Sequence, residues 1–178
     1  MRRALRLHPN SLCSAVTRIA VDVARPDAST LVLTYAVTGS IGDLRLPPAA
    51  APAQTDELWR HTCFEAFVRG VSGETYYEFN FAPSTQWAAY RFTGYRSGMR
   101  IAAEIGAPQI EVSFGAEGYT LKGAIEADQM DLSEKTPWRL GLAVVIEEQN
   151  GQKSYWALAH PPGKPDFHHA DGFAYELS

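Results

Sequence analysis

Cysteine, basic charge and long apolar runs are all scarce in this sequence of 178 residues. Two cysteines, Cys13 and Cys63, are too few for a disulfide framework, which favours a reducing, cytoplasmic setting in which both remain thiols. The 16 Lys and Arg residues are outnumbered by 20 Asp and Glu, and a net charge of −4 argues against binding nucleic acid by neutralising phosphates. No apolar run approaches the ~20 residues that cross a bilayer, and no apolar signal-peptide core follows the first arginines. We therefore expect neither a nucleic-acid partner nor a membrane partner.

Apolar and polar residues alternate over most of the chain, with the period of two that is typical of β-strands. Eight segments have this pattern and are rich in β-branched and aromatic residues. They are residues 15–25, 30–38, 62–69, 75–82, 86–93, 118–126, 138–148 and 153–160, with shorter candidates at 3–8, 109–114 and 173–177. Strands at this spacing predict an all-β, antiparallel sandwich that forms a single domain over residues 1–178, with helix confined to one or two short turns.

Four polar side chains occupy alternate positions in segments otherwise suited to burial, and four aromatic side chains accompany them. The polar residues are Glu65, Glu78, Asn80 and Arg91, and the aromatic ones are Trp59, Tyr76, Trp87 and Trp156. This combination suits a neutral polyhydroxylated ligand, because rings stack on the C–H face of a sugar while polar groups bond its hydroxyls. A cross-strand ion-pair ladder beside core tryptophans explains the pattern equally well. Trp87 and Arg91 lie four residues apart and share one face, which is the ligand surface in the first interpretation and the core in the second.

Histidine and carboxylate residues gather in a proline-rich segment near the C-terminus, at residues 160–171. His160, Asp166 and His168 could line the rim of a ligand site, and His61 could join them from the start of a central strand. Their spacing matches no standard zinc signature, which favours histidines that make hydrogen bonds over a metal site. We therefore predict no bound metal.

Haem is the one cofactor that these residues leave open. An axial pair could combine Met99 or Met130 with His61, His160 or His168. The CxxCH attachment motif is missing, so such a haem would be held without a covalent bond. We expect no cofactor, with haem as the alternative.

Cys63 follows His61 by two residues, a pairing from which a thiolate and its base could be built. No hydrolase-type or papain-type sequence surrounds this cysteine. A buried, apolar thiol is therefore the favoured interpretation, and we predict no catalytic residue.

Three long segments together resemble a known group of proteins. They are DELWRHTCFEAFV (56–68), YYEFNFAPSTQWAAYRFTGYRSGM (76–99) and GLAVVIEEQNGQKSYWALAHPPGKPDFHHADGF (141–173). The combination resembles the DOMON-like proteins of bacteria, which are themselves similar to family 9 carbohydrate-binding modules. This resemblance implies an antiparallel β-sandwich of jelly-roll type that holds a ligand on one face or rim. In the wider superfamily that ligand is a sugar or haem.

The sequence as a whole predicts a non-catalytic module that binds a carbohydrate or a similar small polar molecule. The expected roles are stacking by Trp59, Tyr77, Trp87 and Trp156, hydrogen bonding by Glu65, Glu78, Asn80 and Arg91, and lining of the rim by His61, His160, Asp166 and His168. Two alternatives remain. One is a haem- or metal-binding protein that uses its histidines, and the other is an interaction module that pairs through an exposed sheet edge.

Overall fold

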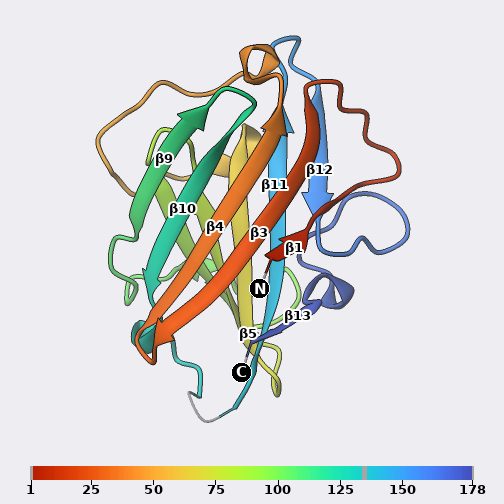
Figure 1. Cartoon of the computed structure of the whole chain (residues 1–178). Coiled ribbons are helices and arrows are strands. Elements are labelled where there is room, and N and C mark those ends of the chain that lie inside the picture. The colour runs from red at the N-terminus through yellow and green to blue at the C-terminus, as the bar shows by residue number, and fades with distance from the viewer. Residues whose placement is uncertain (1, 134–135, 178) are drawn as a thin grey trace.

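Two antiparallel β-sheets packed face to face make up the computed structural model, which describes residues 2–133 and 136–177 (Figure 1). The predicted all-β antiparallel sandwich is confirmed, and the described residues contain no α-helix. Helical backbone is limited there to 3-10 turns of three residues, somewhat more than the one or two turns expected. These turns are Ile41–Asp43, Leu58–Arg60, Ala127–Gln129 and Ala170–Gly172. Within that part of the chain, no helix has the length and apolar character needed to cross a membrane.

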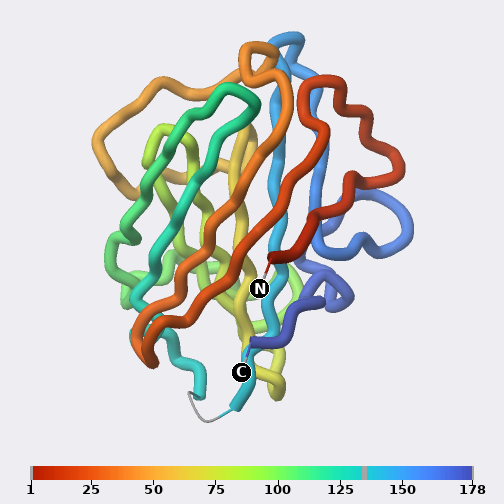
Figure 2. Tube along the Cα trace, viewed as in Figure 1, coloured from red at the N-terminus to blue at the C-terminus, as the bar shows by residue number. Residues whose placement is uncertain are grey.

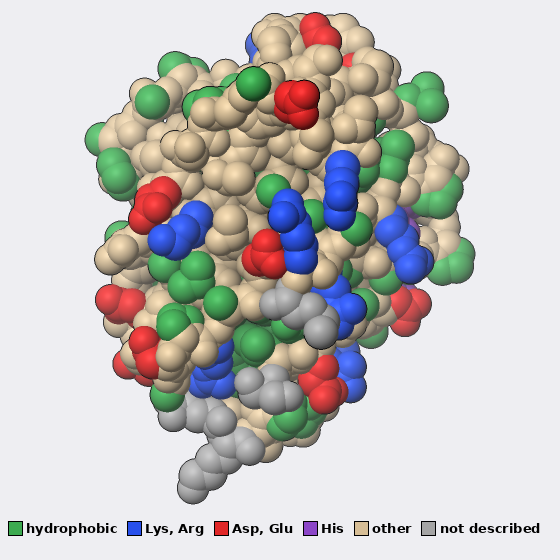
Figure 3. All heavy atoms as spheres, in the orientation of Figure 1, with side chains coloured by type: hydrophobic (Ala, Val, Ile, Leu, Met, Phe, Trp, Pro, Cys, Tyr) green, Lys and Arg blue, Asp and Glu red, His purple; other side chains and the backbone are tan. Residues whose placement is uncertain are grey.

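The first sheet has five strands and forms the front layer in Figure 1. Its strands, in spatial order, are β1 (Arg2–Ala4), β3 (Val16–Asp27), β4 (Thr30–Gly39), β10 (Gly118–Glu126) and β9 (Gln109–Gly115). Figure 3 shows its outer face, where charged side chains of both signs are scattered among other polar groups. One pair on this sheet is Lys122 with Glu111, whose charged atoms lie 3.4 Å apart. This layer therefore presents an ordinary solvated face.

The second sheet has eight strands and lies behind the first in Figure 1. Its spatial order is β2 (Arg6–Leu7), β12 (Lys153–Ala157), β11 (Trp138–Glu147), β5 (Cys63–Gly70), β6 (Tyr76–Phe81), β7 (Trp87–Phe92) and β8 (Arg100–Ile101), with β13 (Tyr175–Leu177) paired to β11. The two chain ends meet across the layers, because the Arg3 guanidinium lies over the Tyr175 ring at 5.6 Å (Figure 2). All the strand segments predicted from the alternation are present, and only β8 was not expected.

The main core fills the space between the two sheets. Alternate residues of the central strands point into it, among them Leu33 and Tyr35 of β4 and Phe64, Phe79 and Phe81 of the opposite sheet. Rings and branched side chains of this size bury enough apolar surface to dominate the stability of the fold.

A second apolar cluster lies on the outer face of the eight-stranded sheet. It contains Phe67, Tyr76, Ala88, Tyr90, Phe92, Ala143, Ala157 and Phe173. Residues 93–99, between β7 and β8, and residues 158–174, between β12 and β13, pack over this face, so β5, β6 and β7 are buried on both sides. A strand covered on both faces can place a polar side chain in a dry environment, and this sheet does so.

We expect Trp87→Ala to lower the free energy of unfolding by about 3–5 kcal/mol, because the side chain is only 6% exposed and belongs to the inter-sheet core. Phe114 on β9 is 60% exposed, so Phe114→Ala serves as a matched aromatic control that should change stability by less than about 0.5 kcal/mol. Urea unfolding followed by far-ultraviolet circular dichroism measures both. Equal losses in the two variants would contradict this assignment of the core.

Candidate functional site

A cavity of about 370 Å³ opens on the outer face of the eight-stranded sheet, between the loops that cover it. We call it the outer-face cavity. Its floor is made of side chains from five neighbouring strands, namely Tyr155, Val145, Glu65, Glu78 and Phe92. Its rim is made of Trp59, Arg96, Met99, Pro165, Phe167 and His168. Three stretches far apart in the sequence therefore meet around one hollow.

Two buried carboxyl groups are the most unusual feature of the floor. Glu65 is 3% exposed and Glu78 is 4% exposed. In the β5–β6 ladder Glu65 is paired with Asn80, so Glu78 stands diagonally across from it on the same face. Burial raises the pKa of both carboxyls, to about 7 for Glu78, and the proximity of Glu78 raises the pKa of Glu65 further.

The hydrogen bonds around these carboxyls are incomplete. Asn80 Nδ2 donates to Glu78 Oε1 at 3.0 Å. Glu65 Oε1 and Asn80 Oδ1 are buried and have no hydrogen-bond partner among the described residues. An unpaired buried polar atom costs roughly 1–3 kcal/mol, so a group that donates to the Glu65 carboxyl would recover part of this free energy.

The rim is fixed by an ion pair between the two covering loops. The Arg96 guanidinium reaches Asp166 Oδ1 at 2.8 Å from Nη2 and 3.3 Å from Nε, and the Tyr95 hydroxyl donates to the same carboxylate. Asp166 also accepts from the His168 backbone N–H at 3.1 Å. Burial opposes ionisation of Asp166, but the bonds from Tyr95 and Arg96 hold its pKa below the ordinary value. The two loops are therefore clamped together at one point beside the cavity.

His168 forms one wall of the outer-face cavity as an uncharged ring. Its Nδ1 is hydrogen-bonded to the Tyr76 hydroxyl at 2.8 Å, and its Nε2 lies 3.7 Å from Glu78 Oε2. Burial lowers the pKa of His168 to about 4, with Arg96 lowering it further, so the imidazole is neutral at pH 7. The part of the chain that the structure describes holds no group of three or more His, Cys, Asp or Glu side chains placed to bind a metal ion.

Four of the residues predicted from the sequence to form the ligand site line the outer-face cavity. They are Trp59, Glu65, Glu78 and His168. Asn80 and Asp166 stand just behind them, Asn80 bonded to Glu78 and Asp166 bonded to Arg96. The alternation of polar residues on β5 and β6 therefore marks one side of a real hollow.

The remaining aromatic candidates lie elsewhere. Tyr77, Trp87 and Trp156 point from the other face of the same sheet into the inter-sheet core, and the Trp156 Nε1–H donates to Ser154 Oγ at 3.1 Å. The expectation that Trp87 lies on an exposed ligand surface is therefore wrong. Trp87 belongs to the core, as the other interpretation of the sequence pattern held.

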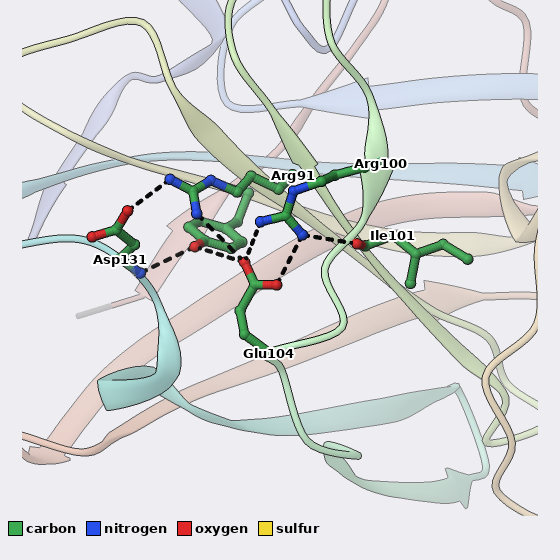
Figure 4. A network of polar contacts seen from close by, with 6 residues as sticks. Arg91, Arg100, Ile101, Glu104 and Asp131 are labelled. Atoms are coloured by element: carbon green, nitrogen blue, oxygen red, sulfur yellow. Dashed lines mark hydrogen bonds and ion pairs between the residues drawn. The ribbon is translucent and has the colours of Figure 1, made fainter.

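Arg91 also projects from the face opposite to Glu78. The β6–β7 register pairs Tyr77 with Arg91 and Glu78 with Tyr90, so Arg91 does not extend the row of polar side chains on β5 and β6. Figure 4 shows its partners, with Arg91 Nη2 2.7 Å from Asp131 Oδ2 and its Nη1 3.7 Å from Glu104 Oε1. This network ties the β7–β8 edge to the loop before β11 and lies away from the outer-face cavity.

Two histidines from the predicted rim bond to other parts of the protein. His61 is exposed, and its Nδ1 is 2.6 Å from Glu147 Oε2. His160 Nε2 bonds to the backbone carbonyl of Arg6 at 2.8 Å. Neither lines the outer-face cavity.

Several lining residues were missed by the sequence interpretation. Tyr155 rather than Trp156 reaches the floor, since Tyr155 is paired with Val145 on the outward face of β11 and β12. Arg96 stands in the glycine-rich loop after β7, in a stretch where arginines and aromatics alternate. Phe167 follows Asp166 directly. The period of two shows which residues share a face, and only the pairing of the strands shows which face carries the cavity.

Cys63 is fully buried, as predicted for a structural thiol. Burial raises its pKa well above the ordinary value, and the neighbouring Glu65 and Glu78 raise it further. The thiol therefore stays protonated and lacks the character of a nucleophile.

We expect the unfolding free energy of Glu78→Gln to exceed that of the wild type by a growing margin as the pH rises. The folded-state pKa of Glu78 is about 7 against 4.5 for an ordinary glutamate, so between these values the folded protein binds more protons than the unfolded chain, and this group's contribution to the unfolding free energy falls as the pH increases. Glutamine keeps an acceptor for Asn80 and removes the titration. His168, whose pKa is lowered, makes the unfolding free energy rise with pH over much the same range. Both proteins contain His168, so its effect cancels from the difference between them.

Urea unfolding at pH 4.5 and at about pH 8 measures this difference. We expect the two proteins to be closest at the lower pH and Glu78→Gln to gain stability steadily through neutrality. A difference that is constant with pH, or that favours the wild type more at the higher pH, would show that Glu78 is not a desolvated carboxyl.

No protein-family model matches this sequence, and no curated protein matches it significantly. The solved structures with a similar fold include the following two. A protein from Bacteroides uniformis ATCC 8492 that is proposed to bind carbohydrate superposes with a TM-score of 0.70 at 14% identity, covering 96% of this chain and 83% of that one. A family 9 carbohydrate-binding module from Caldicellulosiruptor kristjanssonii, in complex with cellotriose, gives 0.52 at 14% identity over 92% of this chain and 74% of its own. The predicted membership of the DOMON-like group stays a prediction. The predicted similarity to family 9 carbohydrate-binding modules is confirmed at the level of the fold.

Proposed function

We propose that this protein is a non-catalytic carbohydrate-binding module whose ligand occupies the outer-face cavity. One observation carries the proposal: Glu65 is buried on the cavity floor with a carboxyl oxygen that no group in the described part of the chain satisfies. An acceptor held in this way is suited to a hydroxyl donor from a ligand, because sugars present many donors in a compact ring.

The walls of the outer-face cavity supply the second element of sugar recognition. Trp59, Tyr155 and Phe167 place aromatic rings around the polar floor. Rings of this kind cover the apolar C–H face of a sugar, while carboxyl groups bond its hydroxyls. A volume of about 370 Å³ is at the small end of ligand sites and suits one or two sugar rings.

The structural neighbours support this choice of ligand class. One is a family 9 module whose structure contains cellotriose, and the other is a protein proposed to bind carbohydrate. Their fold is shared with this chain across nearly its whole length. The chemistry of the cavity independently favours the same class of ligand.

Haem is a second candidate because Met99 and His168 both line the outer-face cavity. The fit is poor. His168 has Nδ1 bonded to Tyr76 and Nε2 facing Glu78, so neither nitrogen is free to ligate iron. Two buried carboxyls on the floor also suit a sugar better than an apolar macrocycle. An absorption band in the Soret region of the purified protein would reverse this preference.

Trp59→Ala should weaken sugar binding by tenfold or more, because it removes a half-buried ring from the rim. Trp59 makes an edge contact with Tyr90 at 5.9 Å and lies outside the main core, so the variant should remain folded. Phe114→Ala, on the other sheet, is the matched control and should bind as the wild type does.

Isothermal titration with a panel of neutral and amino mono- and disaccharides, cellotriose included, measures these affinities. The proposal requires at least one sugar to bind the wild type and the affinity to fall in Trp59→Ala alone. Absence of binding across the panel, or unchanged binding in Trp59→Ala, would contradict it.

A further inference from the structure

We infer that the outer-face cavity selects a sugar bearing a protonated amino group over the same sugar without charge. This inference rests on the carbohydrate-binding function proposed above and narrows its ligand to amino sugars. It follows from the balance of charge and of hydrogen-bond donors on the cavity floor.

In their ionised form, the two floor carboxyls carry more negative charge than the surrounding protein compensates, and burial therefore holds protons on them. Glu65 and Glu78 are both buried there, and Arg96 is the cation whose charge lowers the pKa of each. The Arg96 guanidinium is already held by Asp166 at 2.8 and 3.3 Å, so its charge is largely matched at the rim. His168 is neutral at pH 7. When both carboxyls ionise, the missing positive charge has to come from the ligand or from bound protons.

The hydrogen-bonding inventory has the same imbalance. Among the described residues, Glu65 Oε1 and Asn80 Oδ1 are buried and have no hydrogen-bond partner, and the Asn80 Nδ2 amide donates to Glu78. No hydrogen bond joins Glu65 to Glu78 in the described structure. A sugar hydroxyl offers one donor, whereas an ammonium group offers three donors and a full charge at one point. Ammonium therefore satisfies this floor better than a hydroxyl does.

The aromatic walls favour the same ligand. Trp59, Tyr155 and Phe167 surround the floor, and the negative face of an aromatic ring attracts a cation, most strongly when water is excluded. These rings also cover the C–H face of a sugar ring. An amino sugar can use both the attraction of the rings for a cation and their contact with a C–H face, whereas a small amine without a ring can use only the first.

The titratable groups around the two carboxyls, within the described residues, supply no positive charge beyond Arg96, which leaves bound protons as the alternative to a ligand cation. Tyr35 is one of these groups, and burial raises its pKa, so it stays neutral. Cys63, Tyr76 and Tyr90 lie around the pair, and burial raises the pKa of each, so they stay neutral. Arg96, whose charge is matched by Asp166, and the neutral His168 lie beside them. An arriving ammonium group should therefore displace protons from the carboxyl pair, and binding should release protons to the buffer.

Isothermal titration of the full chain with D-glucosamine, D-glucose and N-acetyl-D-glucosamine tests the inference. The three share a ring, and only the first carries a charge at about pH 6.5. We expect D-glucosamine to bind at least tenfold more tightly than the other two. Repeating the titration in buffers of different ionisation enthalpy should show protons released with D-glucosamine alone.

Variants of the floor locate the effect. Glu65→Gln and Glu78→Gln should each reduce the preference for D-glucosamine over D-glucose severalfold, and melting curves show whether each variant is folded. Glu111→Gln is the matched control, since Glu111 is an exposed carboxylate on the other sheet, paired with Lys122. It should leave the preference unchanged.

Each outcome separates this inference from the proposed function. Equal or tighter binding of D-glucose or N-acetyl-D-glucosamine overturns the preference for charge while carbohydrate binding stands. Equally tight binding of ethanolamine overturns the requirement for a sugar ring. Failure of every sugar to bind overturns both proposals. The comparison of the three sugars on the wild-type protein tests the preference for charge even if a floor variant does not fold.

Discussion

Burial of both faces of the eight-stranded sheet is the constraint on which the rest of this structure depends. One face packs against the five-stranded sheet, and residues 93–99 and 158–174 cover the other. Alternate residues of β5 and β6 therefore enter two different dry environments. Phe64 and Phe79 enter a core that is mostly apolar, whereas Glu65 and Glu78 enter a cavity bounded by loops. The same backbone geometry makes the core and the site.

Such a site costs stability. A buried carboxyl with an unsatisfied oxygen loses its hydration and gains too little from the protein to replace it. The fold offsets this loss elsewhere, through the inter-sheet core and the Arg96–Asp166 clamp that holds the covering loops together. Departures from the rule that buried polar groups are satisfied concentrate at functional sites. In the function proposed here, a sugar or an amino sugar supplies the missing hydrogen bonds at Glu65.

The sequence allowed the strands to be predicted almost completely, because a period of two persists through every long segment. It also allowed Glu65 and Glu78 to be placed together. It could not show that Arg91 faces away from them, since a shift of one residue in strand pairing reverses the face of every side chain. For the same reason Trp156 was chosen where Tyr155 lines the outer-face cavity. Arg96 depends on a loop whose path is set by tertiary contacts, which no local pattern encodes.

A crystal structure of the protein with the sugar that binds most tightly tests the central claim most directly. The account predicts electron density for the ring inside the outer-face cavity, beside Trp59, with a ligand donor within about 3.2 Å of an oxygen of the Glu65 carboxyl. Density on the solvated face of the five-stranded sheet, or in the outer-face cavity without a contact to Glu65, would contradict it.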